Sequence, residues 1–155
     1  MARPTPCLGF DTEGEDAARF YTSVFPNSRI VDIARFGEAG PREAGTVMVV
    51  TFELDGQPFT ALNGGPDFTF SEAVSFQVDC ADQTEVDRYW ETLSEGGEQG
   101  PCGWLKDRFG LSWQIVPTRL TELLADPDRE RSQRVMKAML GMRKIEIAEL
   151  EAAAA

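Results

Sequence analysis

Residues 73–97 read AVSFQVDCADQTEVDRYWETLSEGG, and this stretch joins the pattern of a strand to that of a helix. Alternation of apolar and polar side chains over Ala73–Val78 predicts a strand. Helical spacing follows over Gln83–Leu93, where Asp82 is suited to the N-cap and Glu85 to the reciprocal position of a capping box. Val74, Phe76 and Val78 are expected on one face of the strand. The expected buried stripe of the helix is Val86, Tyr89, Trp90 and Leu93. We therefore predict a β–α unit that ends at the two glycines closing the stretch.

The same order of elements occurs twice along the chain. Downstream, two strands are expected over Cys102–Leu105 and Leu111–Val116, joined by a charged turn that we expect to be solvated. Upstream, a strand, a helix and three strands are expected over Pro6–Phe10, Asp16–Phe25, Arg29–Phe36, Thr46–Leu54 and Pro58–Leu62. The repeat predicts an α+β fold in one domain, with modules over residues 4–66 and 70–117 and a helical tail over residues 118–151.

The tail has a different pattern. Thr118 is a candidate cap for a short helix over Arg119–Leu124. Asp126 and Pro127 are suited to begin a second helix, which Gly141 interrupts. The apolar pattern then continues through Ile145, Ile147 and Leu150. These helices need a surface to pack on, which is either the outer wall of the sheets or a partner subunit.

Charge and composition narrow the classes of partner. The chain has 155 residues with 15 basic and 26 acidic side chains, a net charge of −11. This balance disfavours binding to nucleic acid and to an anionic membrane surface. No apolar run reaches the roughly 18 residues of a membrane helix, and the first residues lack a signal-peptide pattern, so a cytoplasmic protein is expected.

The cysteine and histidine content excludes several chemistries. Three cysteines at wide spacing do not make a disulfide framework. The absence of histidine excludes a Ser-His-Asp triad, a Cys-His pair, a histidine general base and a histidine metal ligand. A magnesium or calcium site built from carboxylates stays open.

Several motifs resemble the PhnB-like branch of the vicinal-oxygen-chelate superfamily, which includes glyoxalase and the bleomycin-resistance proteins. They are FYTSVFPNS at 20–28, FELDGQPF at 52–59, VSFQVDC at 74–80 and CGWLKDRFGLSWQIVP at 102–117. The resemblance implies paired βαβββ modules that form a half-open, barrel-like sheet, the glyoxalase/bleomycin-resistance fold, with C-terminal helices. It also implies a homodimer. Proteins of this branch are often labelled 3-demethylubiquinone-9 3-methyltransferase.

In metal-dependent members of the superfamily, His, Glu or Gln side chains from both modules hold a divalent ion. By the resemblance, the corresponding positions here carry Thr5, Ala73 or Ser75, and Gln114, while Glu53 lies near an acidic position and Asp67 stands where many relatives have a histidine. Thr, Ser, Ala and Gln do not make a tight transition-metal site. We expect no metal and no cofactor, with weak binding of a metal by Glu53, Asp67 or Gln114 left open.

The candidate pocket combines strand and turn residues that the resemblance places around a cavity. They are Phe10, Phe52, Asn63, Phe76, Cys102, Trp104, Arg108, Trp113 and Gln114. Trp104 and Trp113, on adjoining strands, are a candidate aromatic wall for a flat ligand, with core packing as the alternative. Arg108 is a candidate for an anionic group and Gln114 for a hydrogen bond.

These observations favour a metal-free protein that binds a small organic molecule. One alternative is a metal-dependent lyase, isomerase or dioxygenase, and another is a structural dimer whose tail helices are the working surface. Methyl transfer is disfavoured, because an adenosyl donor is usually held by a glycine-rich loop between a strand and a helix. The loop Gly64-Gly65-Pro66 loses an amide donor at the proline, and no helical pattern clearly follows it.

Overall fold

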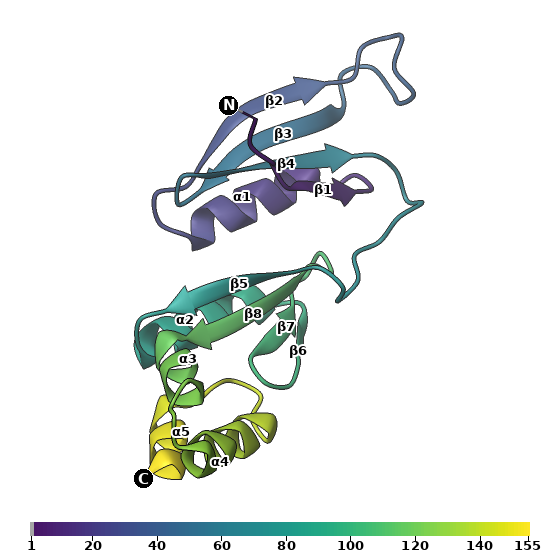
Figure 1. The fold of residues 1–155 in the computed structure, drawn as a ribbon. Helices are drawn as coiled ribbons and strands as arrows, with labels where there is room; N and C mark the ends of the chain where they lie inside the picture. The colour runs from purple at the N-terminus through teal and green to yellow at the C-terminus, as the bar shows by residue number, and fades with distance from the viewer. Residues whose placement is uncertain (1) are drawn as a thin grey trace. The chain divides into compact units, whose positions relative to one another are not determined.

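The computed structural model describes residues 2–155, which divide into two compact units. The first unit ends at Phe70 and the second spans Ser71–Ala155 (Figure 1). Each unit contains a four-stranded mixed sheet, and residues 2–155 form an α+β fold of two sheets and five helices. In the described residues, no helix is long and apolar enough to cross a membrane.

The first unit follows the predicted order. Its elements are β1 (Cys7–Phe10), α1 (Gly14–Val24), β2 (Arg29–Arg35), β3 (Val47–Leu54) and β4 (Gln57–Asn63). The strands lie in the order β1-β4-β3-β2, with β1 parallel to β4 and the other pairs antiparallel. Helix α1 lies against one face of this sheet (Figure 1). The predicted elements are confirmed to within about two residues at each end.

Alternation along the strands builds the core of the first unit. Val50, Phe52 and Leu54 of β3 are all buried, whereas the residues between them are partly exposed. The Phe52 ring stacks on Phe59 of β4 with a centroid separation of 5.4 Å. Tyr21 of α1 contacts the same ring at 6.3 Å. One face of the sheet is thereby sealed by the helix.

The second unit repeats this plan, and its short strand β6 is the one strand that the sequence did not predict. Its elements are β5 (Ser75–Cys80), α2 (Gln83–Ser94), β6 (Glu98–Gln99), β7 (Trp104–Lys106) and β8 (Ser112–Pro117), in sheet order β5-β8-β7-β6. The predicted cap of α2 is confirmed, because the Asp82 carboxylate accepts a 2.9 Å bond from the Glu85 amide. The Glu85 carboxylate accepts from the amide of Ala81, at 2.7 Å, one residue before the position expected in a capping box.

Two strands begin two residues later than predicted. Val74 lies before β5 and is 62% exposed, so it is not part of the strand that contains Phe76. Cys102 lies in a turn before β7, with φ of 57°. Its amide donates to the Met142 carbonyl at 2.8 Å, a bond to the tail that replaces pairing within the sheet.

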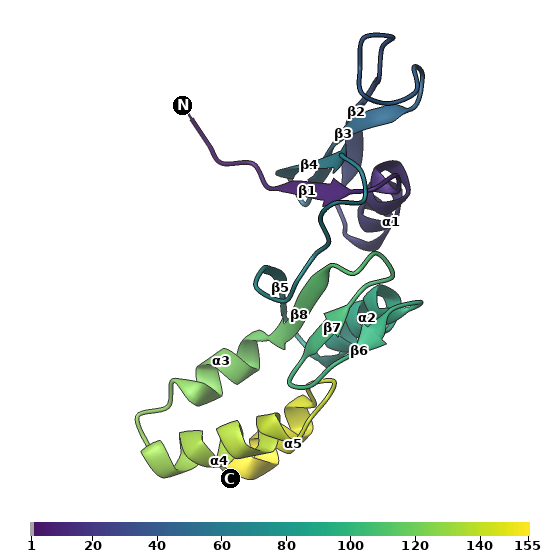
Figure 2. The same cartoon turned by 90° about the vertical axis from the view of Figure 1, so that its right-hand side faces the viewer.

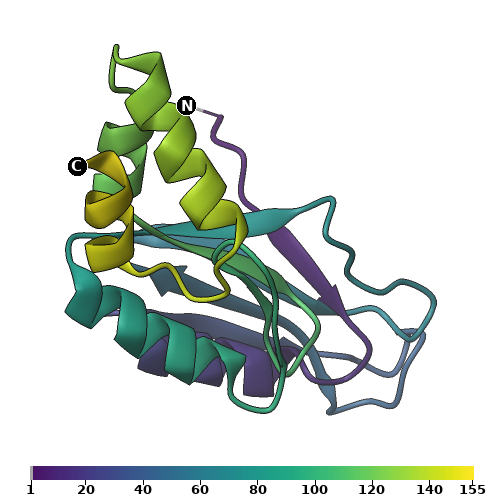
Figure 3. The same ribbon diagram turned by 90° about the horizontal axis from the view of Figure 1, so that it is seen from below.

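The tail forms helices α3 (Thr118–Leu124), α4 (Arg129–Leu140) and α5 (Ile147–Ala154). Their apolar faces meet in a buried cluster of Leu120, Leu123, Val135, Met142, Ile145 and Leu150. The helices therefore pack largely on one another, an arrangement that neither sequence alternative described. Figure 3 shows them gathered at one end of the second unit.

Two of the predicted caps in the tail are wrong. Thr118 is the first residue of α3, and the N-cap position belongs to Pro117, where no side chain makes a capping hydrogen bond. Asp126 does not cap α4, because its carboxylate accepts a 2.8 Å bond from the Asp128 amide in the turn before the helix. Asp128 is the cap, accepting from the Arg131 amide at 3.2 Å.

The loop before α5 ties the tail to the rest of the second unit (Figure 2). The Gln83 side chain donates to the Ile145 carbonyl at 3.0 Å and accepts from the Ile147 amide at 2.7 Å. Lys144 forms an ion pair with Asp87 of α2 at 2.9 Å. One glutamine on the first turn of α2 thus fixes the start of the last helix.

Candidate functional site

Strand register sorts the predicted pocket residues of the second unit onto two faces. Phe76 lies opposite Trp113, while Trp104 lies opposite Gln114 and Leu105 opposite Trp113. Because neighbouring residues of a strand point to opposite faces, Trp104 and Trp113 do not lie on the same side of the sheet. The predicted aromatic wall of these two rings is therefore wrong.

The face that holds Trp113 is core. Trp113 is 3% exposed, and its ring lies 5.6 Å from that of Phe76. Its indole Nε1 donates to an Asp107 carboxylate oxygen at 2.9 Å. The same carboxylate accepts from the amides of Phe109, at 2.8 Å, and Leu111, at 3.1 Å. The turn that the sequence predicted to be solvated thus contains a buried aspartate, and only Arg108 beside it is exposed.

The candidates in the first unit also lie in core. Phe10 and Phe52 are 3% and 0% exposed. The Asn63 side chain accepts from the Gly14 amide at 2.8 Å and donates to the carbonyls of Thr12, at 3.3 Å, and Val47, at 3.1 Å. Its amide therefore joins the start of α1 to the sheet, a role that the sequence did not suggest.

The opposite face of the second sheet, which we call the open face, carries the polar groups. It presents Ser75, Gln77, Trp104, Lys106, Ser112 and Gln114, which the register aligns on one side. Gln114 donates to the Ser75 hydroxyl at 3.0 Å. Lys106 hydrogen-bonds to Glu72, and this contact raises the pKa of the Lys106 ammonium and lowers the pKa of the Glu72 carboxyl.

A cavity of about 240 Å³ opens beside these residues, and we call it the Ser112 pocket. Its lining residues are Glu72, Glu98, Gln99, Gly100, Pro101, Trp104, Leu105, Lys106 and Ser112. Ser112 is 1% exposed, and its Oγ has no hydrogen-bond partner among residues 2–155. A buried hydroxyl left unpaired costs about 1–3 kcal/mol, which marks this atom as a group that a ligand can satisfy.

The positions that hold metal in other members of the superfamily do not fit a metal here. Ser75 and Gln114 are neutral and bond to each other, and Thr5 lies exposed before β1. Glu53 is paired with Arg29 at 2.9 Å. Within the described part of the chain, no three Cys, Asp or Glu side chains gather closely enough to hold an ion. These side chains therefore do not form a binding site for a metal ion.

The cysteines of the second unit are placed for structure. Cys80 is fully buried, and burial raises its thiol pKa to about 12, with a smaller contribution from the charge of Glu85. At neutral pH such a thiol stays protonated and is a poor nucleophile. Cys102 is held in the turn against the loop that precedes α5.

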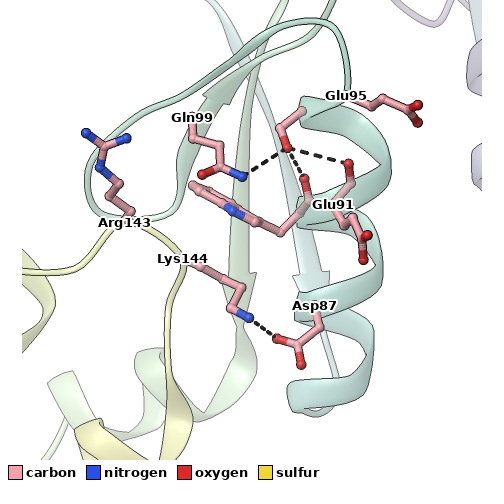
Figure 4. A pocket seen from close by; sticks show the side chains of 8 residues that line it. Asp87, Glu91, Glu95, Gln99, Arg143 and Lys144 are labelled. Carbon is pink, nitrogen blue, oxygen red and sulfur yellow. Dashed lines mark hydrogen bonds and ion pairs between the residues drawn. The ribbon is translucent and has the colours of Figure 1, made fainter.

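A second, wider cavity of about 890 Å³ lies between α2 and the loop before α5. Its lining residues are Asp87, Trp90, Glu91, Ser94, Glu95, Gln99, Arg143 and Lys144. Figure 4 shows Lys144 reaching Asp87 across this gap. This cavity was not predictable from the sequence, because its basic side chains come from the tail and its acidic ones from α2 and the residue that follows it.

Comparison with known proteins identifies relatives for most of the chain. The family model described as 3-demethylubiquinone-9 3-methyltransferase matches residues 2–116. The PhnB protein from Bacillus cereus is 36% identical, covers 75% of this chain and 99% of its own length, and has a TM-score of 0.67. No curated protein matches the chain.

Two further solved structures share the fold. Protein PA1353 from Pseudomonas aeruginosa is 19% identical over 76% of this chain and 98% of its own, with a TM-score of 0.63. The fosfomycin resistance protein FosX from Mesorhizobium loti is 17% identical over 81% and 98%, with a TM-score of 0.57. The matched family region ends just before α3, so the tail helices lie beyond it.

Proposed function

Because the chain belongs to the 3-demethylubiquinone-9 3-methyltransferase family and has the vicinal-oxygen-chelate fold, we propose that it binds a small organic molecule on the open face of the second sheet. The observation that carries this proposal is the unpaired Ser112 hydroxyl at a cavity lined by Trp104. Binding pockets combine apolar walls with a few placed polar groups, and the Ser112 pocket has this composition.

The Ser112 hydroxyl supports the presence of a ligand, because it contributes no hydrogen bond to the folded protein within the described residues. Pro101 supplies apolar wall, and Trp104 offers a half-buried ring. A ligand that hydrogen-bonds to Ser112 recovers a bond that folding left unmade, worth about 0.5–1.5 kcal/mol. An alanine at this position would serve the packing of the ligand-free protein better.

Binding is favoured over methyl transfer by the segment that follows β4. Residues 64–74 contain no helix, so the glycines after β4 do not open onto a helix N-terminus that could hold the phosphate or carboxylate of a cofactor. Gly65 has φ of 100°, a left-handed conformation that glycine adopts readily in a turn. We therefore propose a binding protein that uses neither metal nor adenosyl donor.

Native mass spectrometry of the purified protein, together with the Ser112→Ala variant, tests this function. We propose that the protein is a homodimer and expect two chains that retain a small molecule, and no retained molecule in the variant. Ser112→Ala should raise the free energy of unfolding of the ligand-free protein by about 1 kcal/mol. Ser75→Ala is the matched control, because its hydroxyl is bonded to Gln114 and its loss should lower that free energy.

Two outcomes would contradict the proposal. One is a Ser112→Ala protein that retains the same molecule with unchanged affinity. The other is a ligand-free Ser112→Ala protein that is less stable than the wild type, since this would show that the hydroxyl is already satisfied by the fold.

A further inference from the structure

We infer that the Ser112 pocket takes a small organic cation, an ammonium or amidinium group joined to a flat ring, an inference that rests on the binding function proposed above. The argument combines the charges of the lining, the position of Trp104, the hydrogen-bonding capacity of Ser112 and the size of the cavity.

The charges of the lining sum to a negative value. Glu72, Glu98 and Lys106 are its ionisable side chains, two acidic and one basic. Lys106 is paired with Glu72, and both side chains are partly exposed. The charge of Glu98, directly opposite Lys106 in the β6–β7 pair, raises the pKa of Lys106, but less than the contact with Glu72 does. Glu98 forms no close ion pair of its own within residues 2–155. Its carboxylate is therefore the charge available to an incoming ligand.

Anionic ligands are disfavoured on two scales. Within the pocket, the single ammonium is already occupied by Glu72, and Glu98 would repel a second carboxylate. Over the whole chain, the net charge of −11 raises the local concentration of cations and lowers that of anions. Both effects act in the same direction, and both weaken as salt is added.

Trp104 offers a second attraction for a cation. It lies two residues before Lys106 on β7, so the two side chains share the open face. A cation over the face of an indole is attracted by the negative face of the ring, and tryptophan is the best of the aromatic side chains for this contact. A ligand ring can also stack against Trp104 while its charged arm reaches Glu98.

Ser112 completes the site as an acceptor. An ammonium carries three N–H donors, and the Ser112 oxygen and the Glu98 carboxylate can each accept one. Bonds to a charged donor are stronger than neutral ones, which favours ammonium over a neutral amide at the same place. The volume of about 240 Å³ is below the roughly 300–1,000 Å³ of pockets for drug-sized ligands, so the ligand is a single ring with a short arm.

Three probes with one ring and arms of similar size separate charge from shape: phenethylamine, phenylacetamide and phenylacetate. Each is titrated into the ligand-free protein while the indole N–H signal of Trp104 is followed by NMR. We expect phenethylamine to bind about tenfold tighter than phenylacetamide, with phenylacetate weakest. Raising the salt concentration tenfold should weaken the amine and leave the amide unchanged.

Variants assign the preference to Glu98. Glu98→Gln should reduce the affinity for phenethylamine to that of phenylacetamide, without changing the affinity for the amide. Glu91→Gln is the matched control, because Glu91 is exposed on α2 and lines the other cavity. If phenylacetamide or phenylacetate binds as tightly as phenethylamine and its binding still depends on Ser112, the preference for a cation is wrong, whereas the proposed binding function stands. If none of the three probes shifts the Trp104 signal, both the cation preference and the proposed binding function are wrong.

Discussion

The buried aspartate of the β7–β8 turn makes the strongest prediction about folding. Asp107 is 2% exposed and accepts three hydrogen bonds, from two backbone amides and the Trp113 indole. In Asp107→Asn, the amide oxygen can still accept from the backbone, but the amide nitrogen then faces the indole donor. In Asp107→Ala, all three donors lose their acceptor.

The expected loss follows from these bonds. A hydrogen bond to a charged acceptor contributes about 1.5–3 kcal/mol, and a buried donor left unpaired costs about 1–3 kcal/mol. The bonds share one acceptor, so their contributions do not add, and the Phe109 amide is close enough to the surface to be hydrated in part. We expect Asp107→Ala to lower the free energy of unfolding by about 3–5 kcal/mol and Asp107→Asn by about 2–3 kcal/mol.

Urea unfolding followed by tryptophan fluorescence measures this loss in the right part of the chain. The three tryptophans, Trp90, Trp104 and Trp113, all lie in the second unit, so the signal reports that unit alone. Asp79→Asn is the control, because Asp79 is exposed and its loss should stay within about 0.5 kcal/mol. An Asp107→Asn protein as stable as the Asp79→Asn protein would show that the three bonds do not hold the turn.

Three further predictions concern other buried groups. Asn63→Ala should destabilise the first unit by about 2–4 kcal/mol, measured by urea unfolding followed by circular dichroism, because three backbone groups lose their partner. Cys80 has a folded-state pKa of about 12 against an ordinary value of 9.0, so the stability that it contributes is complete below about pH 9 and is lost as the pH rises toward 12. In Cys80→Ala, the decline of unfolding free energy over this pH window should be shallower. Gln83→Ala should release the start of α5, so limited proteolysis should cut near Ile147 faster than in the wild type, with cleavage elsewhere unchanged.

The sequence predicted the order of elements because the two sheets and their helices obey local periodicities. The β-branched and aromatic residues of β3 and the apolar stripe of α2 each identify one element without reference to the rest of the chain. The Asp82 cap was predictable for the same reason, since its partner lies three residues away. Strand β6, with two residues, is too short to show a period.

The errors have a common cause in bonds between distant parts of the chain. Cys102 reads as the start of a strand, yet its amide bonds to Met142, forty positions on. The apolar faces of the tail helices pack against one another. No local pattern shows whether such faces will be covered by the outer wall of the sheets, by a partner subunit or by the neighbouring helices. Asp126 and Asp128 are both good caps, and a turn bond within the pair decides between them.

The site was predicted in part, and strand alternation explains which part. Trp104 and Gln114 were candidates, and the register places them together on the open face. Trp113 was a candidate for the same wall, although one step along a strand places its ring in the core. Ser112, one residue earlier, was not among the candidates. Nothing in the sequence distinguishes it from Ser75, which faces the same way and is bonded to Gln114.

The contrast between these two serines is the physical basis of the functional argument. Both hydroxyls lie on the open face of one sheet, on strands paired to each other, at directly opposed positions. One is satisfied by a glutamine that the fold supplies, and the other is buried beside a cavity without a partner. If the open face served packing alone, both would be expected to be satisfied or replaced by an apolar residue, since an unpaired buried hydroxyl costs stability and an alanine does not. That Ser112 keeps this cost next to an aromatic ring and a carboxylate is the physical support for the proposal that the open face binds a ligand.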